Sequence, residues 1–256
     1  MLKVHNLSKR VICMMMIALM LLVTNSGIVF ASNSDNIYKY NTKTKTFSFN
    51  NGSEVQVLSD SLNDLLLVYG SPEGTLKSDK DAIEKVRVVK DKLAPTQNLN
   101  ETSNGEVSAR TTSVRYLGDY EETDYGDGQV YSRQEGTATM TGGTYVQDVV
   151  TDGHTRTAWS GTSPQWYSSK IKLSESWKFN GISVTVSYPP SFSGSGDTVT
   201  WEGEDTSGTH YTMDHYYNGV SGRSYVSLWS LTKRSTGSHY FSSTGAWVSA
   251  FCNETI

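Results

Sequence analysis

Carboxylates are concentrated in residues 118–129, a segment that could supply ligands for a hard cation. The five acidic side chains are Asp119, Glu121, Glu122, Asp124 and Asp127. Carboxylate oxygens on a bent loop are what Ca²⁺ requires, and the glycines at 126 and 128 allow the chain to bend. The spacing differs from the EF-hand pattern, which needs a ligand Glu at its twelfth position. A Ca²⁺ site is therefore one interpretation and a solvated turn is the other, and no other cofactor is predicted.

A second group of residues that could hold a metal is His210, Asp214 and His215. On a helix the two histidines could converge on one ion. The surrounding residues alternate between polar and apolar and instead predict a strand, on which His210 and Asp214 share one face while His215 points to the other. We therefore expect these histidines to be structural or to lie at the surface.

Glu175 is the carboxylate with the most unusual predicted environment. It falls on the apolar side of an alternating run, where a carboxylate needs either a raised pKa or a partner. A bulge, or a strand end that reaches solvent, is the alternative. The chain has no G-x-S-x-G nucleophile motif. A binding role is therefore favoured over an enzymatic one, with an extracellular hydrolase kept as an alternative.

Aromatic residues among Ser, Thr, Asn and Asp could stack on sugar rings while the polar groups bind hydroxyls. All six Trp lie after residue 110. Trp159, Trp166 and Tyr167 fall in less regular segments, so they are the predicted surface platform for a ligand, together with Glu175. Ordinary core packing of aromatic residues in strands explains the same composition.

The elements that would position these residues are mostly strands. Asn180–Gly181 and Asn218–Gly219 each lie between alternating runs, and Asn-Gly favours a type I′ hairpin turn. The first turn would pair Trp177 with Val184. Many short strands with frequent turns predict an antiparallel β-sandwich for residues 111–256, a mainly β fold with Asn-Gly hairpins.

Residues 32–94 predict a smaller α/β region before the sandwich. A hairpin turns at Asn50-Asn51-Gly52, a short helix is predicted within residues 59–70, and a second helix contains Ile83 and Val86 and ends before Pro95. Residues 95–110 are polar and read as a linker. Arg110 could be a processing site that makes residues 32–110 a pro-region, and an ordinary exposed linker is the alternative.

The first 31 residues have the pattern of a secretory signal peptide. A basic segment precedes an apolar run of 13 residues at 11–23, and Val29-Phe30-Ala31 carries small residues at the cleavage positions. The run is shorter than the roughly 18 residues of a membrane span. We expect cleavage after Ala31, secretion to the extracellular space and no transmembrane segment in the mature chain. Only Cys252 then remains, so no internal disulfide is expected.

Charge and a local resemblance narrow the choice of function. Residues 111–256 hold nine basic and fifteen acidic side chains, a net of −6, which argues against nucleic-acid binding. The run WKFNGISVTVSYPPSFSGSGDTVTW at residues 177–201 resembles uncharacterised secreted proteins of Gram-positive bacteria over residues 165–205. The resemblance implies an extracellular all-β domain and assigns no catalytic residue.

Together these patterns predict a secreted β-sandwich protein that binds a polysaccharide or another cell-envelope component. The alternative is a membrane-active protein, either a β-pore or bacteriocin-like, because alternating strands rich in Ser and Thr also occur in inserted β-barrels. The oligomeric state is not predicted.

Overall fold

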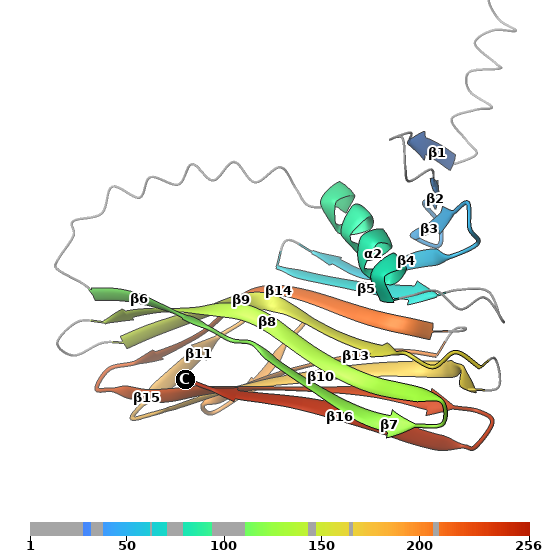
Figure 1. The fold of residues 1–256 in the computed structure, drawn as a ribbon. Coiled ribbons are helices and arrows are strands. Elements are labelled where there is room, and N and C mark those ends of the chain that lie inside the picture. The colour runs from blue at the N-terminus through green and yellow to red at the C-terminus, as the bar shows by residue number, and fades with distance from the viewer. Residues whose placement is uncertain are drawn as a thin grey trace, which may run out of the picture.

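The chain forms a mainly antiparallel β-sandwich with a helix on one of its outer faces (Figure 1). The structure is a computed structural model that describes residues 28–31, 38–61, 63–70, 79–93, 111–142, 147–163, 166–206 and 210–256. The predicted fold class, an antiparallel β-sandwich preceded by a small region that contains a helix, is therefore confirmed.

The first layer is built around two long strands, β9 and β14, that pair along most of their length. From one edge to the other its order is β6 and β7, then β8, β9, β14, β5, β4, β3, β2 and β1, with β11 also paired to β14. Its strands are β1 (Ile28–Ala31), β2 (Tyr38–Asn41), β3 (Thr46–Phe49), β4 (Glu54–Ser61), β5 (Asp64–Gly70), β6 (Thr111–Tyr116), β7 (Asp119–Tyr125), β8 (Gly128–Gly142), β9 (Gln147–Trp159), β11 (Val184–Ser187) and β14 (His210–Ser224).

The second layer has the order β12, β13, β10, β15 and β16. Its strands are β10 (Ser168–Gly181), β12 (Ser193–Ser195), β13 (Thr198–Asp205), β15 (Leu228–Phe241) and β16 (Ala246–Thr255). Within the described residues, one backbone pair, Ser168 with His210, joins this layer to the first. The second layer therefore presents one face to the first layer and the other to solvent.

Alternation along β10 places the core between the layers. Ile171, Leu173, Trp177 and Phe179 are all buried, as is Glu175 on the same side, whereas the residues that alternate with them are partly or fully exposed. They pack in the main core cluster, to which the first layer contributes residues such as Met213. Full burial of each large apolar side chain stabilises the fold by roughly 1.5–3 kcal/mol, so this cluster fixes which side of the layer faces inward.

The N-terminal region is part of the first layer. Strand β5 pairs with β14 along its length. Helix α2 (Asp79–Leu93) packs against β5 and β4 on the side away from the second layer (Figure 1). Leu66 and Val68 face the main core while Leu67 and Tyr69 face the helix. The sheet thus continues across the boundary expected between residues 94 and 111.

The burial of β5 on both faces explains one wrong prediction. The run at residues 64–69 was expected within a short helix, but it is a strand. A strand covered on both sides is apolar at every position and loses the alternation that identifies a half-exposed strand. The second predicted helix is confirmed as α2, and the hairpin at Asn50-Asn51-Gly52 is confirmed by the pairing of β3 with β4.

The prediction of a hairpin turn at each of the two Asn-Gly pairs is wrong. After Gly181 the chain turns through Ile182 and Ser183, but the returning strand β11 crosses to the first layer and pairs with β14. Trp177 consequently pairs with residues of β13 and β15, not with Val184. Asn218–Gly219 lies inside the continuous strand β14, where Gly219 has φ +83° and marks a bulge opposite β9.

The predictions for the signal peptide, the linker and Cys252 have different outcomes. Most of the predicted signal peptide and the whole of the linker at 95–110 lie outside the described residues, while residues 28–31 form β1. No helix among the described residues is long and apolar enough to span a membrane. Cys252 is buried in β16 with its thiol next to the carbonyl oxygen of Ser132, as expected of a small core residue.

Candidate functional site: the outer face of the second layer

The solvent-facing side of the second layer, called here the outer face, is a regular grid of side chains. Its members alternate with the core residues on each strand and lie in register across β16, β15, β10 and β13. They are Trp247, Ser249, Phe251, Asn253, Thr255, Thr232, Arg234, Thr236, Ser238, Tyr240, Lys170, Lys172, Ser174, Ser176, Lys178, Thr198, Thr200, Glu202 and Glu204. The face is thus rich in hydroxyl groups, with aromatic rings on one side.

The aromatic side chains gather along β16 and the neighbouring strand. Trp247 is 45% exposed and Phe251 is 53% exposed, and the two lie about 13 Å apart along β16 because they are four residues apart on one strand. Trp247 contacts Tyr240 with ring centroids 5.4 Å apart. Large rings exposed on a flat sheet can stack on the apolar face of a ligand ring.

A groove with a volume of about 530 Å³ lies next to Phe251, whose neighbours Thr236 and Arg234 line it. Phe251, Thr236, Ser174 and Glu202 are successive partners across four strands and form one row on the face. Of this row, all but Phe251 line the groove. The volume is within the range of about 300–1,000 Å³ that small-ligand sites occupy.

The next row supplies further polar groups. Arg234, Ser176, Thr200 and Ser193 are successive partners on β15, β10, β13 and β12, and all four line the groove. The guanidinium of Arg234 also lies 4.9 Å from the centroid of the Phe251 ring. Two adjacent rows therefore place hydroxyls, one guanidinium and one carboxylate within reach of the same ligand.

The outer face carries four basic side chains, Arg234, Lys170, Lys172 and Lys178, and two acidic ones, Glu202 and Glu204. Lys172 and Glu202 form an ion pair at 2.6 Å, with both side chains at least one-third exposed. Lys170 lies over the ring of Tyr240 with its ammonium 5.0 Å from the centroid. The many hydroxyls of this face offer both donors and acceptors to a neutral polar ligand.

Glu175 points to the other side of the same strand, into the core, as its place in the sequence predicts. One carboxylate oxygen is 2.6 Å from Nδ1 of His215, and the other is 3.3 Å from Nζ of Lys233. Nε2 of His215 lies 2.9 Å from Oδ1 of Asp64, and Lys233 donates to the hydroxyl of Thr155 at 2.7 Å. We call these five residues the interior charge cluster, and they connect β5, β9, β10, β14 and β15.

The interior charge cluster is held ionised by its own members. Burial raises the pKa of the Glu175 carboxyl, but Lys233 and His215 outweigh burial and hold that pKa below its usual value. Burial lowers the pKa of the His215 imidazole, but Glu175 and Asp64 raise it above its usual value. The ring of Trp201 stacks on His215 with centroids 3.6 Å apart. The cluster is thus closed to solvent and stabilises the contact between layers.

Asp214 and His215 face opposite sides of β14, as predicted for neighbouring residues of a strand. Asp214 therefore belongs to a second charged group, which lies on the side of β14 that faces the helix. Arg156 donates to both carboxylate oxygens of Asp214 and also to Asp79 at the start of helix α2. His154 contacts Asp214 at 2.8 Å. Burial raises the pKa of the Asp214 carboxyl, but Arg156 and His154 hold that pKa below its usual value. This group fixes the helix to the sheet.

The aromatic residues predicted as a platform do not share one surface. Trp159 is only 2% exposed and packs against Phe241 in a small core cluster. Trp166 packs edge-on against Tyr125 in the same cluster, and Tyr167 is partly exposed. Glu175 is buried in the interior charge cluster. The structure therefore does not bring these four residues together.

The predicted Ca²⁺ ligands also point in different directions, because residues 119–125 form strand β7. Asp119 accepts from the backbone N–H of Asn253, and Asp127 accepts from the N–H groups of Thr162 and Ser163. Glu122 and Asp124 both accept from the Gln129 amide. In the part of the chain that the structure describes, no three His, Cys, Asp or Glu side chains gather closely enough to hold a metal ion.

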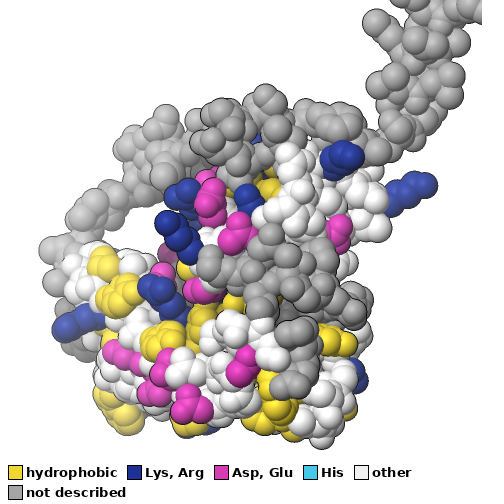
Figure 2. Space-filling view, turned by 45° about the vertical axis from the view of Figure 1, so that its right-hand side comes forward, with side chains coloured by type: hydrophobic (Ala, Val, Ile, Leu, Met, Phe, Trp, Pro, Cys, Tyr) yellow, Lys and Arg dark blue, Asp and Glu magenta, His cyan; other side chains and the backbone are white. Residues whose placement is uncertain are grey.

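Comparison with protein-family models and with curated proteins finds no match to this chain. Residues of the outer face were therefore identified from geometry alone. The pattern that could have indicated Trp247 and Phe251 is the alternation of the last strand, Trp247-Val248-Ser249-Ala250-Phe251-Cys252, in which the rings occupy one side. On the side of the molecule seen in Figure 2, Lys and Arg are interspersed with Asp and Glu.

Proposed function

We propose that the protein is a secreted, extracellular binding protein and that its outer face binds a polysaccharide of a cell envelope. The observation that carries this proposal is the groove on the outer face, which is lined by hydroxyls and has the exposed ring of Phe251 beside Thr236 at one side, with Trp247 farther along β16. A sugar ring has an apolar C–H face that packs on an aromatic ring and hydroxyls around its edge that need donors and acceptors. The outer face offers both kinds of contact side by side.

The two rows of side chains that line the groove run across the strands, so they indicate how a polymer would lie on the outer face. A chain laid across the strands would place one ring on Phe251 and the following rings over Thr236, Ser174 and Glu202, at about 4.8 Å per strand. Polymeric glycan therefore fits better than a free monosaccharide.

The test is a pull-down of the purified protein with protein-free cell-wall sacculi and with insoluble glucans. The variant Trp247→Ala/Phe251→Ala is expected to bind at least about tenfold more weakly, because exposed aromatic anchors carry a large share of such binding energy. Trp229→Ala is the matched control, since Trp229 is also exposed but lies outside the outer face.

Three outcomes would contradict the proposal: no binding to any glycan, equal binding by the double variant, or loss of binding in the control. Unfolding by urea should be nearly the same in all variants, because the substituted rings are exposed. Release of reducing ends from the glycan during the assay would favour the extracellular hydrolase over a binding protein.

A further inference from the structure

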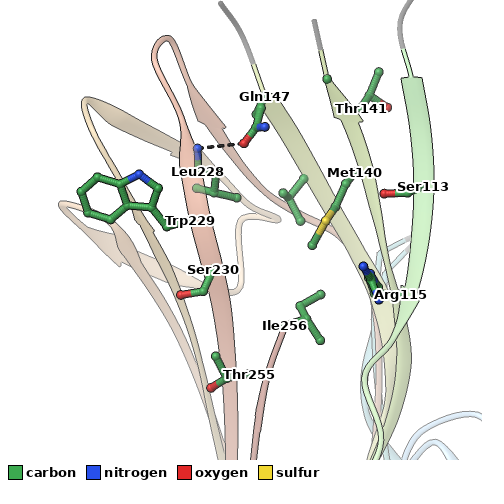
Figure 3. Close-up of a pocket in the computed structure, with 12 residues that line it drawn as sticks. Ser113, Arg115, Met140, Thr141, Gln147, Leu228, Trp229, Ser230, Thr255 and Ile256 are labelled. Carbon is green, nitrogen blue, oxygen red and sulfur yellow. Dashed lines mark hydrogen bonds between the residues drawn. The ribbon is translucent and has the colours of Figure 1, made fainter.

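A second cavity lies between the two layers at one end of the sandwich, and none of its lining residues lines the groove on the outer face. It has a volume of about 610 Å³ and is lined by residues of β6, β8, β9, β15 and β16 (Figure 3). Gln147 accepts a hydrogen bond from the backbone N–H of Leu228 at 2.9 Å and ties the two layers together at the opening. We call this cavity the end slot.

The floor of the end slot is apolar. Met140, Leu228 and Ile256 are partly buried and pack against the main core cluster, to which the buried residue Val149 belongs. In Figure 3 the side chains of Met140 and Ile256 lie on facing sides of the slot. An apolar cavity holds water poorly, so an apolar ligand that fills it gains most of the free energy of its own dehydration.

The rim of the end slot is polar and carries a positive charge. Arg115 lies on β6, its side chain is exposed, and it forms no ion pair with any residue that the structure describes. Ser113 and Thr141 stand beside it on the same wall. A long apolar floor with one guanidinium at its mouth complements a molecule with an apolar tail and an anionic head.

The surface next to the opening is also apolar. Trp229 on β15 is 68% exposed and is one of the residues that line the slot (Figure 3). Tyr225 and Val226, in the connection that leads into β15, are each more than half exposed. Exposed aromatic and aliphatic side chains beside an apolar opening would contact the tail of a molecule as it enters.

From the apolar floor, the exposed guanidinium of Arg115 and the exposed rim we infer that the end slot binds a single acyl chain of an anionic amphiphile. The head group lies at Arg115 and the tail runs along Met140 and Ile256 toward Val149. This ligand can be a free fatty acid or a lipid of a membrane, and both share the same chemistry. The end slot shares no lining residue with the groove on the outer face, so this inference does not depend on the proposed glycan site.

The test is a calorimetric titration of the purified protein with octanoate, decanoate and dodecanoate below their micelle concentrations. We expect one site per chain and an affinity that rises about fourfold for each added methylene, which is the factor expected for a fully buried CH₂ group. Met140→Trp, which fills the slot, is expected to weaken dodecanoate binding at least about tenfold.

Arg115→Gln separates head-group recognition from the tail site. It should weaken dodecanoate binding and leave the binding of dodecyl maltoside, which has the same tail and a neutral head, unchanged. Because Arg115 is exposed on an edge strand, this variant is expected to fold normally even if Met140→Trp does not. Phe251→Ala is the matched control on the outer face and should bind dodecanoate as the unchanged protein does.

Absence of dodecanoate binding, an affinity independent of chain length, or an affinity in Met140→Trp and Arg115→Gln as high as that of the unchanged protein would overturn the inference. Liposomes of anionic phospholipid identify the source of the chain. Co-sedimentation that Arg115→Gln reduces supports a membrane lipid, whereas binding of dodecanoate without co-sedimentation supports a free fatty acid. Because glycan binding is measured with Trp247→Ala/Phe251→Ala, failure of the end slot and failure of the outer face are distinguishable.

Discussion

The two sides of strand β10 use polar residues in opposite ways. On the inner side Glu175 is fully enclosed and contacts His215 and Lys233, so every charge has a partner within the fold. On the outer side Ser174 and Ser176 line an open groove and leave their hydroxyls available. Adjacent residues of one strand thus serve stability on one face and binding on the other.

The difference shows why a perturbed carboxylate is not by itself a binding site. A buried ionised group needs partners to offset its loss of hydration, and once those partners are found the group is no longer accessible to a ligand. Exposed hydroxyls and rings are hydrated in the free protein, and a ligand can replace that water. The outer face is therefore the better place to look for recognition, although the inner face holds the stronger interactions.

The largest expected effect is on the inner side. Glu175→Gln leaves Lys233 and His215 with an uncompensated positive charge, so we expect it to lower the free energy of unfolding by about 3–5 kcal/mol. Glu202→Gln is the control, because it breaks the exposed pair with Lys172 and should cost less than about 1 kcal/mol. Urea denaturation at neutral pH measures both. Equal losses in the two variants would contradict the distinction between the faces.

Lowering the pH is expected to reduce the stability by less than the Glu175→Gln substitution does. The folded-state pKa values of Glu175 and Asp64 are lowered, so their stabilisation is present above their usual values near pH 4 and is lost as pH falls through the lowered folded values. The difference in stability between the unchanged protein and Glu175→Gln should therefore narrow steadily below about pH 4. Denaturation curves recorded between pH 2 and pH 7 test this, and a constant difference would contradict it.

Above neutral pH the stability is expected to change with pH in the opposite direction. The folded-state pKa of His215 is raised, so its contribution is complete below about pH 6.5, its usual value, and is lost as pH rises through the raised folded value. As pH rises above about 6.5, the free energy of unfolding of His215→Gln should therefore fall less than that of the unchanged protein. The same denaturation series, extended to pH 10, measures the difference, and identical alkaline profiles would show that His215 is not charged in the folded protein.

The fold class could be predicted from the sequence because alternation and turn residues are local signals. The hairpin partners could not, since they depend on contacts between residues far apart in the chain. Asn180–Gly181 favours a local hairpin, but burial of Trp177 between the layers is served better by pairing with β13 and β15. At Gly219 the left-handed backbone is used for a bulge within a long strand.

The site was only partly predictable for a related reason. The inward orientation of Glu175 follows from its apolar neighbours on the strand, but its partners come from β5, β14 and β15. On β16 both sides carry apolar residues, and a preference for burying the larger ones would place Trp247 and Phe251 inside. The structure instead buries the small residues Ala250 and Cys252, because they face β7 and β8 of the first layer.

The central claim is that a polysaccharide binds the outer face, and the tryptophan side chains provide a direct measurement. Each of the six indole N–H groups gives one signal in a spectrum of ¹⁵N-labelled protein. On addition of a soluble fragment of the bound glycan, the signal of Trp247 should shift, while those of the buried Trp159 and Trp177 and of the exposed Trp229 should stay in place. A shift of Trp229 with none at Trp247, or no shift at saturating glycan, would contradict the claim.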